Sequence, residues 1–232
     1  MKLKIYSLLV VISLFVATAV SAQDIPNSRD FPVRDFDKLY IEGGYKVILY
    51  QTSDPFLKVK APADNYIDEL EVQTDAQSLR LSVKRSFLNL NRMELHIGFS
   101  NLIELHVEGG ITLSTDGFVS VDDLSLHIEG GAKGDLKLKA RSLEVTSNGG
   151  VVFDLSGVTD KLSVKVAGAG HVNARELTAR EVFFRVEGLG FGSVHATDIL
   201  DVRIEGMGKV TYVGNPETRR IVNGLGSVVP YE

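Results

Sequence analysis

The sequence contains no cysteine, and this absence sets the first limits on what the protein can be. Without cysteine, the chain can form no disulfide bond and can carry no lipid on a processed N-terminal cysteine. Beyond the N-terminus no apolar run reaches membrane-spanning length, so we expect no transmembrane segment in the mature chain. The net charge is −5 without a basic excess, which makes nucleic acid and anionic membranes poor partners.

The N-terminus has the features of a secretory signal peptide. Two early lysines precede an apolar run over residues 8–17, and Val20-Ser21-Ala22 fits a small-x-small cleavage site. The run is too short and wrongly flanked for a spanning helix, and an uncleaved anchor is the alternative. The sequence therefore predicts a signal peptide over residues 1–22 and an exported chain, in the periplasm or on the cell surface of a Gram-negative bacterium.

A glycine recurs at nearly constant spacing through residues 101–232. It stands at positions 109, 130, 149, 168, 188, 206 and 224, at intervals of 21, 19, 19, 20, 18 and 18 residues. Internal periods of this length are typical of solenoids, in which each unit stacks on its neighbour. Ile41-Glu42-Gly43-Gly44 resembles these units, so we expect it to be an early or capping version of the repeat.

Apolar residues recur with period two before each repeat glycine, which predicts one inward strand face per unit and a continuous core between stacked units. In the last unit Arg220, which follows Arg219, stands where the other units have apolar residues. A terminal unit that faces solvent requires such polar residues. The inward positions two, four and six residues before the glycine are Val107, Ile128, Ser147, Val166, Val186, Ile204 and Val222, then Leu105, Leu126, Val145, Val164, Phe184, Val202 and Arg220, then Ile103, Leu124, Leu143, Leu162, Val182 and Leu200.

The remaining patterns predict an all-β protein, because no window longer than a turn has a persuasive period of 3.6 residues. Residues 23–35 form an irregular lead-in, and residues 36–100 an N-terminal β region or cap. Within this cap, alternating runs around Asp75-Ala76-Gln77-Ser78 predict a β-hairpin. The predicted fold is a single-stranded parallel β-helix, or solenoid, with coils over residues 101–232 continuous with the cap; an antiparallel β-sandwich is the alternative.

The outward positions of the same strands place a basic column beside an acidic column. Residues two apart share a strand face, and neighbouring coils lie about 4.8 Å apart. One interpretation is a charge-balanced, solvated face; the other is a polar groove for a glycan or a protein partner. The candidate binding residues are His106, Glu108, His127, Glu129, Lys165, Arg185, Glu187, Arg203 and Glu205.

Other chemistries find less support in the sequence. Glu108 and Glu129 would stack like the carboxylates of solenoid polysaccharide lyases or hydrolases, but no insertion loop builds the cleft that such an enzyme needs. His106 and His127 are two donors where a metal site needs three or four. The Gly-x-Gly units precede no helix that could hold a dinucleotide. We therefore predict no enzymatic activity, no catalytic residue, no metal and no cofactor.

Two aromatic residues break the outward pattern. Phe183 occupies a position where other coils carry glutamate, serine or aspartate, and Phe191 lies in the glycine-rich turn that follows Gly188. Exposed aromatic side chains can anchor an interface, although local packing is the alternative. They are candidates for a homo-oligomer interface between sheet faces.

Ile41-Glu42-Gly43-Gly44, the Leu79-Arg80-Leu81 hairpin, and coils that change from Val-Glu-Gly-Gly to Gly-x-Gly resemble a family of exported bacterial proteins, the putative auto-transporter adhesin, head GIN domain. The resemblance spans roughly residues 36–229 and implies a β-helical surface head with an adhesive role, without site residues. The function we expect is a non-enzymatic, adhesin-like or cell-envelope binding module. The alternatives are a carbohydrate-active enzyme and a structural envelope protein without a discrete ligand.

Overall fold

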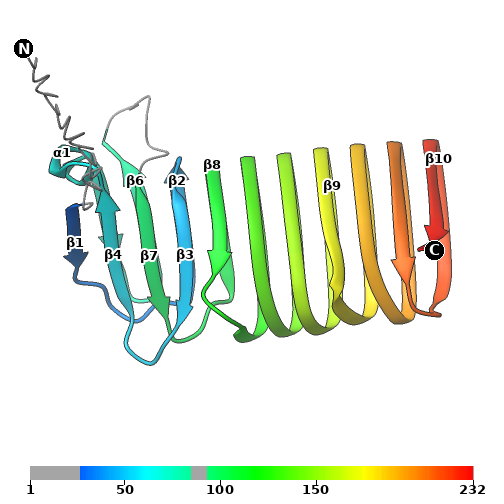
Figure 1. The fold of residues 1–232 in the computed structure, drawn as a ribbon, viewed down its shortest axis with the longest axis horizontal. Helices are drawn as coiled ribbons and strands as arrows, with labels where there is room; N and C mark the ends of the chain where they lie inside the picture. Colours follow the sequence, from blue (N-terminus) through cyan, green and yellow to red (C-terminus); the bar gives the residue numbers. More distant parts are fainter. Residues whose placement is uncertain (1–26, 85–92, 232) are drawn as a thin grey trace, which may run out of the picture.

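The computed structural model describes residues 27–84 and 93–231, so the predicted signal peptide and the start of the lead-in lie outside the described residues. The fold is all-β, as predicted: one short helix, α1 (Asp64–Asp68), accompanies the strands of a ten-stranded sheet (Figure 1). Within the described ranges, no helix is long and apolar enough to cross a membrane.

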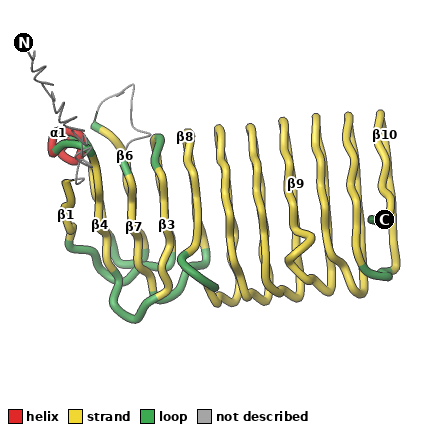
Figure 2. The backbone as a smooth tube through the Cα atoms, in the orientation of Figure 1, coloured by secondary structure: helices red, strands yellow, loops and turns green. Residues whose placement is uncertain are grey.

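The C-terminal half consists of β8 (Glu104–Thr115), β9 (Val119–Val213) and β10 (Glu217–Pro230). β9 is extended throughout and turns back beside itself repeatedly (Figures 1 and 2). β8 pairs with β9 in parallel, Leu105 opposite Leu126, and β10 pairs with β9 in parallel, Gly224 opposite Gly206. The paired residues are 21 apart in the first case and 18 apart in the second, which matches the glycine intervals. Parallel pairing at this spacing does not fit an antiparallel sandwich.

The repeat glycines stack directly on one another. A Cβ atom added at any of the seven would lie less than 3.0 Å from the carbonyl oxygen of the glycine in the preceding layer. The stack begins at Gly43, which confirms that the early Gly-Gly unit belongs to the repeat. The chain bends at each repeat glycine, and we call this bend the corner of the layer. Only glycine fits there, because the backbones of adjacent layers approach closely. In most layers the glycine also has a positive φ, such as +129° at Gly188.

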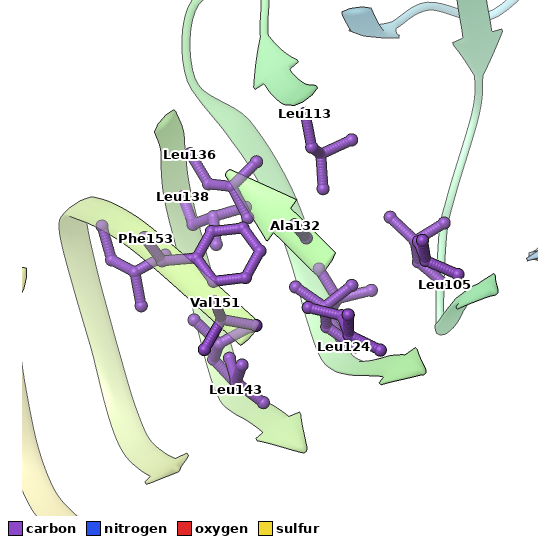
Figure 3. Packing of buried hydrophobic residues seen from close by; sticks show 14 of the residues in the cluster. Leu105, Leu113, Leu124, Ala132, Leu136, Leu138, Leu143, Val151 and Phe153 are labelled. Atoms are coloured by element: carbon purple, nitrogen blue, oxygen red, sulfur yellow. The ribbon is translucent and has the colours of Figure 1, made fainter. Parts of the chain in front are cut away.

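The inward columns form one apolar core, and Figure 3 shows its packing around Leu105, Leu124 and Leu143. The prediction was wrong for Ile103, which is 38% exposed. Ile103 precedes the start of β8, and its N–H donates to the carbonyl of Asp37, so it belongs to a connection and not to a strand. Val222 is 37% exposed because its layer is the last described.

Ser147 is the polar member of an otherwise apolar inward column. Its side chain is fully buried, and its hydroxyl has no hydrogen-bond partner within the described part of the chain. We expect Ser147→Val to raise the free energy of unfolding by about 1–3 kcal/mol, because it removes an unpaired hydroxyl and matches Ile128 and Val166 in adjacent layers. Urea denaturation would measure this change. Ser147→Ala is the control with a smaller expected gain, and a loss of stability in both variants would contradict the prediction.

The layers at the N-terminal end do not follow the order of the chain. β2 (Lys38–Gly43) and β3 (Lys46–Gln51) form a layer that pairs with β8 on one side. On the other side, β2 pairs with β6 (Ser78–Val83) and β3 with β7 (Glu94–Phe99), again in parallel. A later part of the sequence thus supplies the layer beneath an earlier one.

Antiparallel strands cover this end of the stack. β4 (Phe56–Ala61) pairs with β7, β1 (Asn27–Phe31) pairs with β4, and β5 (Leu70–Thr74) pairs with β6. The β5–β6 pair is the predicted hairpin. The hydroxyl of Ser78 and the N–H groups of Gln77 and Ser78 donate to the Asp75 carboxylate and lower its pKa to about 2.

At the last layer, β10, the side chain of Arg220 covers the end of the core. Arg220 stands in the inward column but is exposed, as predicted for a terminal coil. Its guanidinium donates to the carbonyl of Val228 at 3.1 Å and to the hydroxyl of Tyr212 at 3.0 Å. The charged group therefore lies across the end of the apolar core, a common protection of an open sheet edge.

Candidate functional site

We call the residues of the predicted outward columns the charged face (His106, Glu108, His127, Glu129, Lys165, Arg185, Glu187, Arg203 and Glu205). His106 pairs with His127 and Glu108 with Glu129 between β8 and β9. The two imidazole rings lie 6.4 Å apart, centroid to centroid. The structure therefore brings together the four residues at the start of the charged face.

The histidine row continues into the N-terminal layers. Tyr40 of β2 pairs with His106, with ring centroids 6.0 Å apart, and the guanidinium of Arg80 of β6 lies 3.9 Å from the centroid of the Tyr40 ring. Arg80, Tyr40, His106 and His127 thus form one stack over four layers. A guanidinium over an aromatic ring is attracted by the negative face of the ring, which favours an ordered arrangement.

A row of carboxylates runs beside this stack. Glu42 pairs with Glu108, which pairs with Glu129, and all three side chains are exposed. Among the described residues, no ion pair involves any of them. A hollow of about 420 Å³ lies at the start of both rows, lined by Tyr40, Glu42, Gln73, Arg80, Ser82, His106 and Glu108, with Ile41 and Leu81.

The C-terminal part of the charged face is different, because its charges neutralise one another. Lys165 lies 3.5 Å from Glu187, and Arg185 contacts both Glu187 at 2.8 Å and Glu205 at 3.1 Å. Arg203 lies 3.6 Å from Asp201. These partly exposed pairs form a charge-balanced network, whereas the acidic side chains at the start of the face remain available to a ligand.

Phe183 and Phe191 lie on either side of the Gly188 corner. Phe183 is half-buried, and the ammonium group of Lys161 lies 5.1 Å from the centroid of its ring. Phe191 is 45% exposed. The inward neighbour Phe184 fills the space that a side chain at Gly192 would occupy.

Sequence analysis missed Tyr40, Glu42 and Arg80. Tyr40 and Glu42 stand three and one residues before Gly43, the same spacing as His106 and Glu108 before Gly109, so the repeat contained a signal for them. Arg80 had no such signal, because no repeat glycine follows it and its position depends on the pairing of β6 with β2.

A second polar cluster, also missed, joins β3 to β7. The hydroxyl of Tyr50 is hydrogen-bonded to Nδ1 of His96 at 2.8 Å, Nε2 of His96 lies 2.6 Å from Glu94, and Glu94 accepts from Lys46 at 2.8 Å. Burial raises the pKa of Glu94, but Lys46 and His96 outweigh it and lower the pKa overall. The hydrogen bonds of Tyr50 and Lys46 tie the two strands together, whereas the buried Nε2 of His96 has no partner in hydrogen-bond geometry in the described part of the chain.

Metal ligation requires several side chains that converge on one point. In residues 27–84 and 93–231, no three histidine, aspartate or glutamate side chains converge to hold a metal ion. Glu42 and Glu108 line the hollow, but both are exposed to water. Their carboxylates can therefore accept hydrogen bonds from a polar ligand.

The model of the family described as putative auto-transporter adhesin, head GIN domain, matches residues 35–216. The chain belongs to this family. The resemblance seen in the sequence is thus confirmed over most of the chain. The comparison with curated proteins found no match.

Several solved structures share the fold of this chain. A putative adhesin from Bacteroides fragilis has a TM-score of 0.78 at 24% identity, over 89% of this chain and 97% of that chain. A putative adhesin from Parabacteroides merdae has a TM-score of 0.64 at 17% identity, over 89% and 96%. A putative lipid binding protein from Parabacteroides distasonis has a TM-score of 0.59 at 20% identity, over 89% and 97%.

Proposed function

We propose that the protein is an exported, non-enzymatic, adhesin-like module that binds a glycan or protein partner at the cell envelope. The observation that carries this proposal is the unpaired carboxylate row beside the Arg80–Tyr40–His106–His127 stack, at a hollow of about 420 Å³. Membership of a family described as adhesin heads, and similar structures named as putative adhesins, support the same role.

The proposed organisation follows the sequence periods. Residues 1–22 are a signal peptide, residues 23–35 a lead-in, residues 36–100 the cap, and residues 101–232 the coils of a single-stranded parallel β-helix. The parallel register and the glycine stack support the helical winding. The signal peptide and the family support a location in the periplasm or on the surface of a Gram-negative cell.

Within this proposal, the two parts of the charged face have different tasks. His106, Glu108, His127 and Glu129 form the binding part, where donors and acceptors lack partners in the described chain. Lys165, Arg185, Glu187, Arg203 and Glu205 form a paired part that extends the polar surface. Phe183 and Phe191 would contribute to side-by-side contacts of a homo-oligomer, because Phe191 exposes a large apolar surface.

The test is a glycan array and a cell-binding assay with the mature chain and a Glu108→Gln/Glu129→Gln variant. We expect the variant to lose about 10-fold or more in affinity, because two charged acceptors become neutral and their hydrogen bonds to the ligand weaken. Glu187→Gln/Glu205→Gln, in the paired part, is the matched control and should bind like the wild type. Unchanged binding by the first variant would contradict the site, and release of products from a bound glycan would contradict the non-enzymatic role.

A further inference from the structure

A further hollow lies outside the charged face. It has a volume of about 690 Å³ and follows the turns that lead from one layer to the next. Val121, Ala140, Thr159 and Thr178, each 19 residues after the last, line it from successive turns of β9. We call this hollow the turn groove. None of its lining residues belongs to the charged face.

The proportions of the turn groove suit one extended chain. Four turns at about 4.8 Å per layer give a length of roughly 15–20 Å. The lining thus offers similar positions from layer to layer along the axis of the stack. Gln51 bounds the N-terminal end, where its amide is hydrogen-bonded to the N–H and the carbonyl of Ser120 at 2.8 and 2.6 Å.

The charges along the turn groove alternate in sign. Asp122 is followed in the next turn by Lys139 and Arg141, then by Asp160, then by Arg180. Arg141 pairs with Asp123, and Arg180 with Asp198 at 3.1 Å. The side chains of Asp122, Lys139 and Asp160 have no ion pair or hydrogen bond within the described ranges. A polyanion would meet two aspartates, and a polycation would meet the basic groups, so the groove suits an uncharged polymer with many hydroxyl groups.

A peptide fits the turn groove less well. Peptides that bind to sheets usually add a strand to a free edge and gain main-chain hydrogen bonds. The turn groove instead runs across the turns of β9, which lie beside other layers on both sides (Figure 1). Its apolar surface, from Val121, Ala140 and the 48% exposed Val158, is small and suits the C–H faces of sugar rings.

We propose that the turn groove binds a neutral, linear glycan chain along the axis of the stack. Asp122 and Asp160 accept hydrogen bonds from its hydroxyls, and Lys139 and Arg180 donate to its oxygens. This site is separate from the charged face, so either site can exist without the other.

The test uses the mature chain with a panel of soluble polysaccharides: linear neutral glucan, mannan and xylan, anionic polygalacturonate, and cationic chitosan. Isothermal titration calorimetry compares the wild type with Asp122→Lys/Asp160→Lys, which makes the turn groove uniformly basic. Asp135→Lys/Asp154→Lys is the matched control, because it changes the net charge equally at two exposed positions outside the groove. The Glu108→Gln/Glu129→Gln variant is titrated as well, and thermal unfolding shows that all four proteins are folded.

We expect the wild type to prefer a neutral chain, and the groove variant to lose about 10-fold or more in affinity for it, because two acceptors are removed. The groove variant should gain affinity for polygalacturonate, and the control should not. No binding of any neutral polysaccharide, or equal losses in both variants, would overturn the proposal. Loss only in Glu108→Gln/Glu129→Gln would also overturn it, while leaving the charged face as the binding site.

Discussion

Replacing Gly188 with alanine is expected to lower the free energy of unfolding by about 3 kcal/mol or more. Gly188 has φ of +129°, a conformation that residues with a side chain rarely adopt. A Cβ atom there would also overlap the carbonyl oxygen of Gly168 in the layer below, and backbone on both sides leaves no room to relax. Denaturant unfolding followed by circular dichroism would measure the loss.

Gly150→Ala is the matched control for this experiment. Gly150 follows the repeat glycine of its own layer, but a Cβ atom there would have no atom within 4 Å, and its φ is not in the positive region. The change should stay within about 1 kcal/mol and can be stabilising, because alanine restricts the unfolded chain. Equal losses at Gly188 and Gly150 would show that the glycine stack does not require close backbone approach.

Phe153→Ala is expected to cost about 3–5 kcal/mol, because it removes a fully buried aromatic side chain from a core that cannot collapse completely. Figure 3 shows the ring packed among Leu136, Leu138 and Val151. The ring occupies the space that a side chain at Gly134, in the layer before, would need. The same unfolding measurement would determine the loss.

The two positions should be coupled in a double-mutant cycle. Gly134→Ala alone is expected to destabilise the protein, because the new methyl group would overlap the Phe153 ring. In the Phe153→Ala background the methyl group enters the cavity, so its cost should fall by at least about 1 kcal/mol. Additive effects would contradict the idea that the absent side chain at Gly134 makes room for the ring.

Much of the C-terminal half could be predicted from the sequence, because its structure is local and periodic. The stacked glycines, the inward columns and the outward pairs His106–His127 and Glu108–Glu129 all follow from a period of two within strands and of 18–21 between layers. Each new layer repeats contacts of the previous one, so the residues that meet are those at equal positions in the repeat.

Only the tertiary structure decided the arrangement at the N-terminal end. β6 and β7 lie beneath β2 and β3, and this insertion places Arg80 on Tyr40 and leaves Ile103 in an exposed connection. Such contacts join segments that share no period, so no spacing in the sequence marks them. The turn groove combines both kinds of contact: its lining residues from β9 recur every 19 residues, whereas Gln51 at its N-terminal end comes from β3 and has no such spacing. The repeat determines which residues meet between equivalent layers. Contacts between segments outside the repeat are determined by how those segments pack in the folded chain.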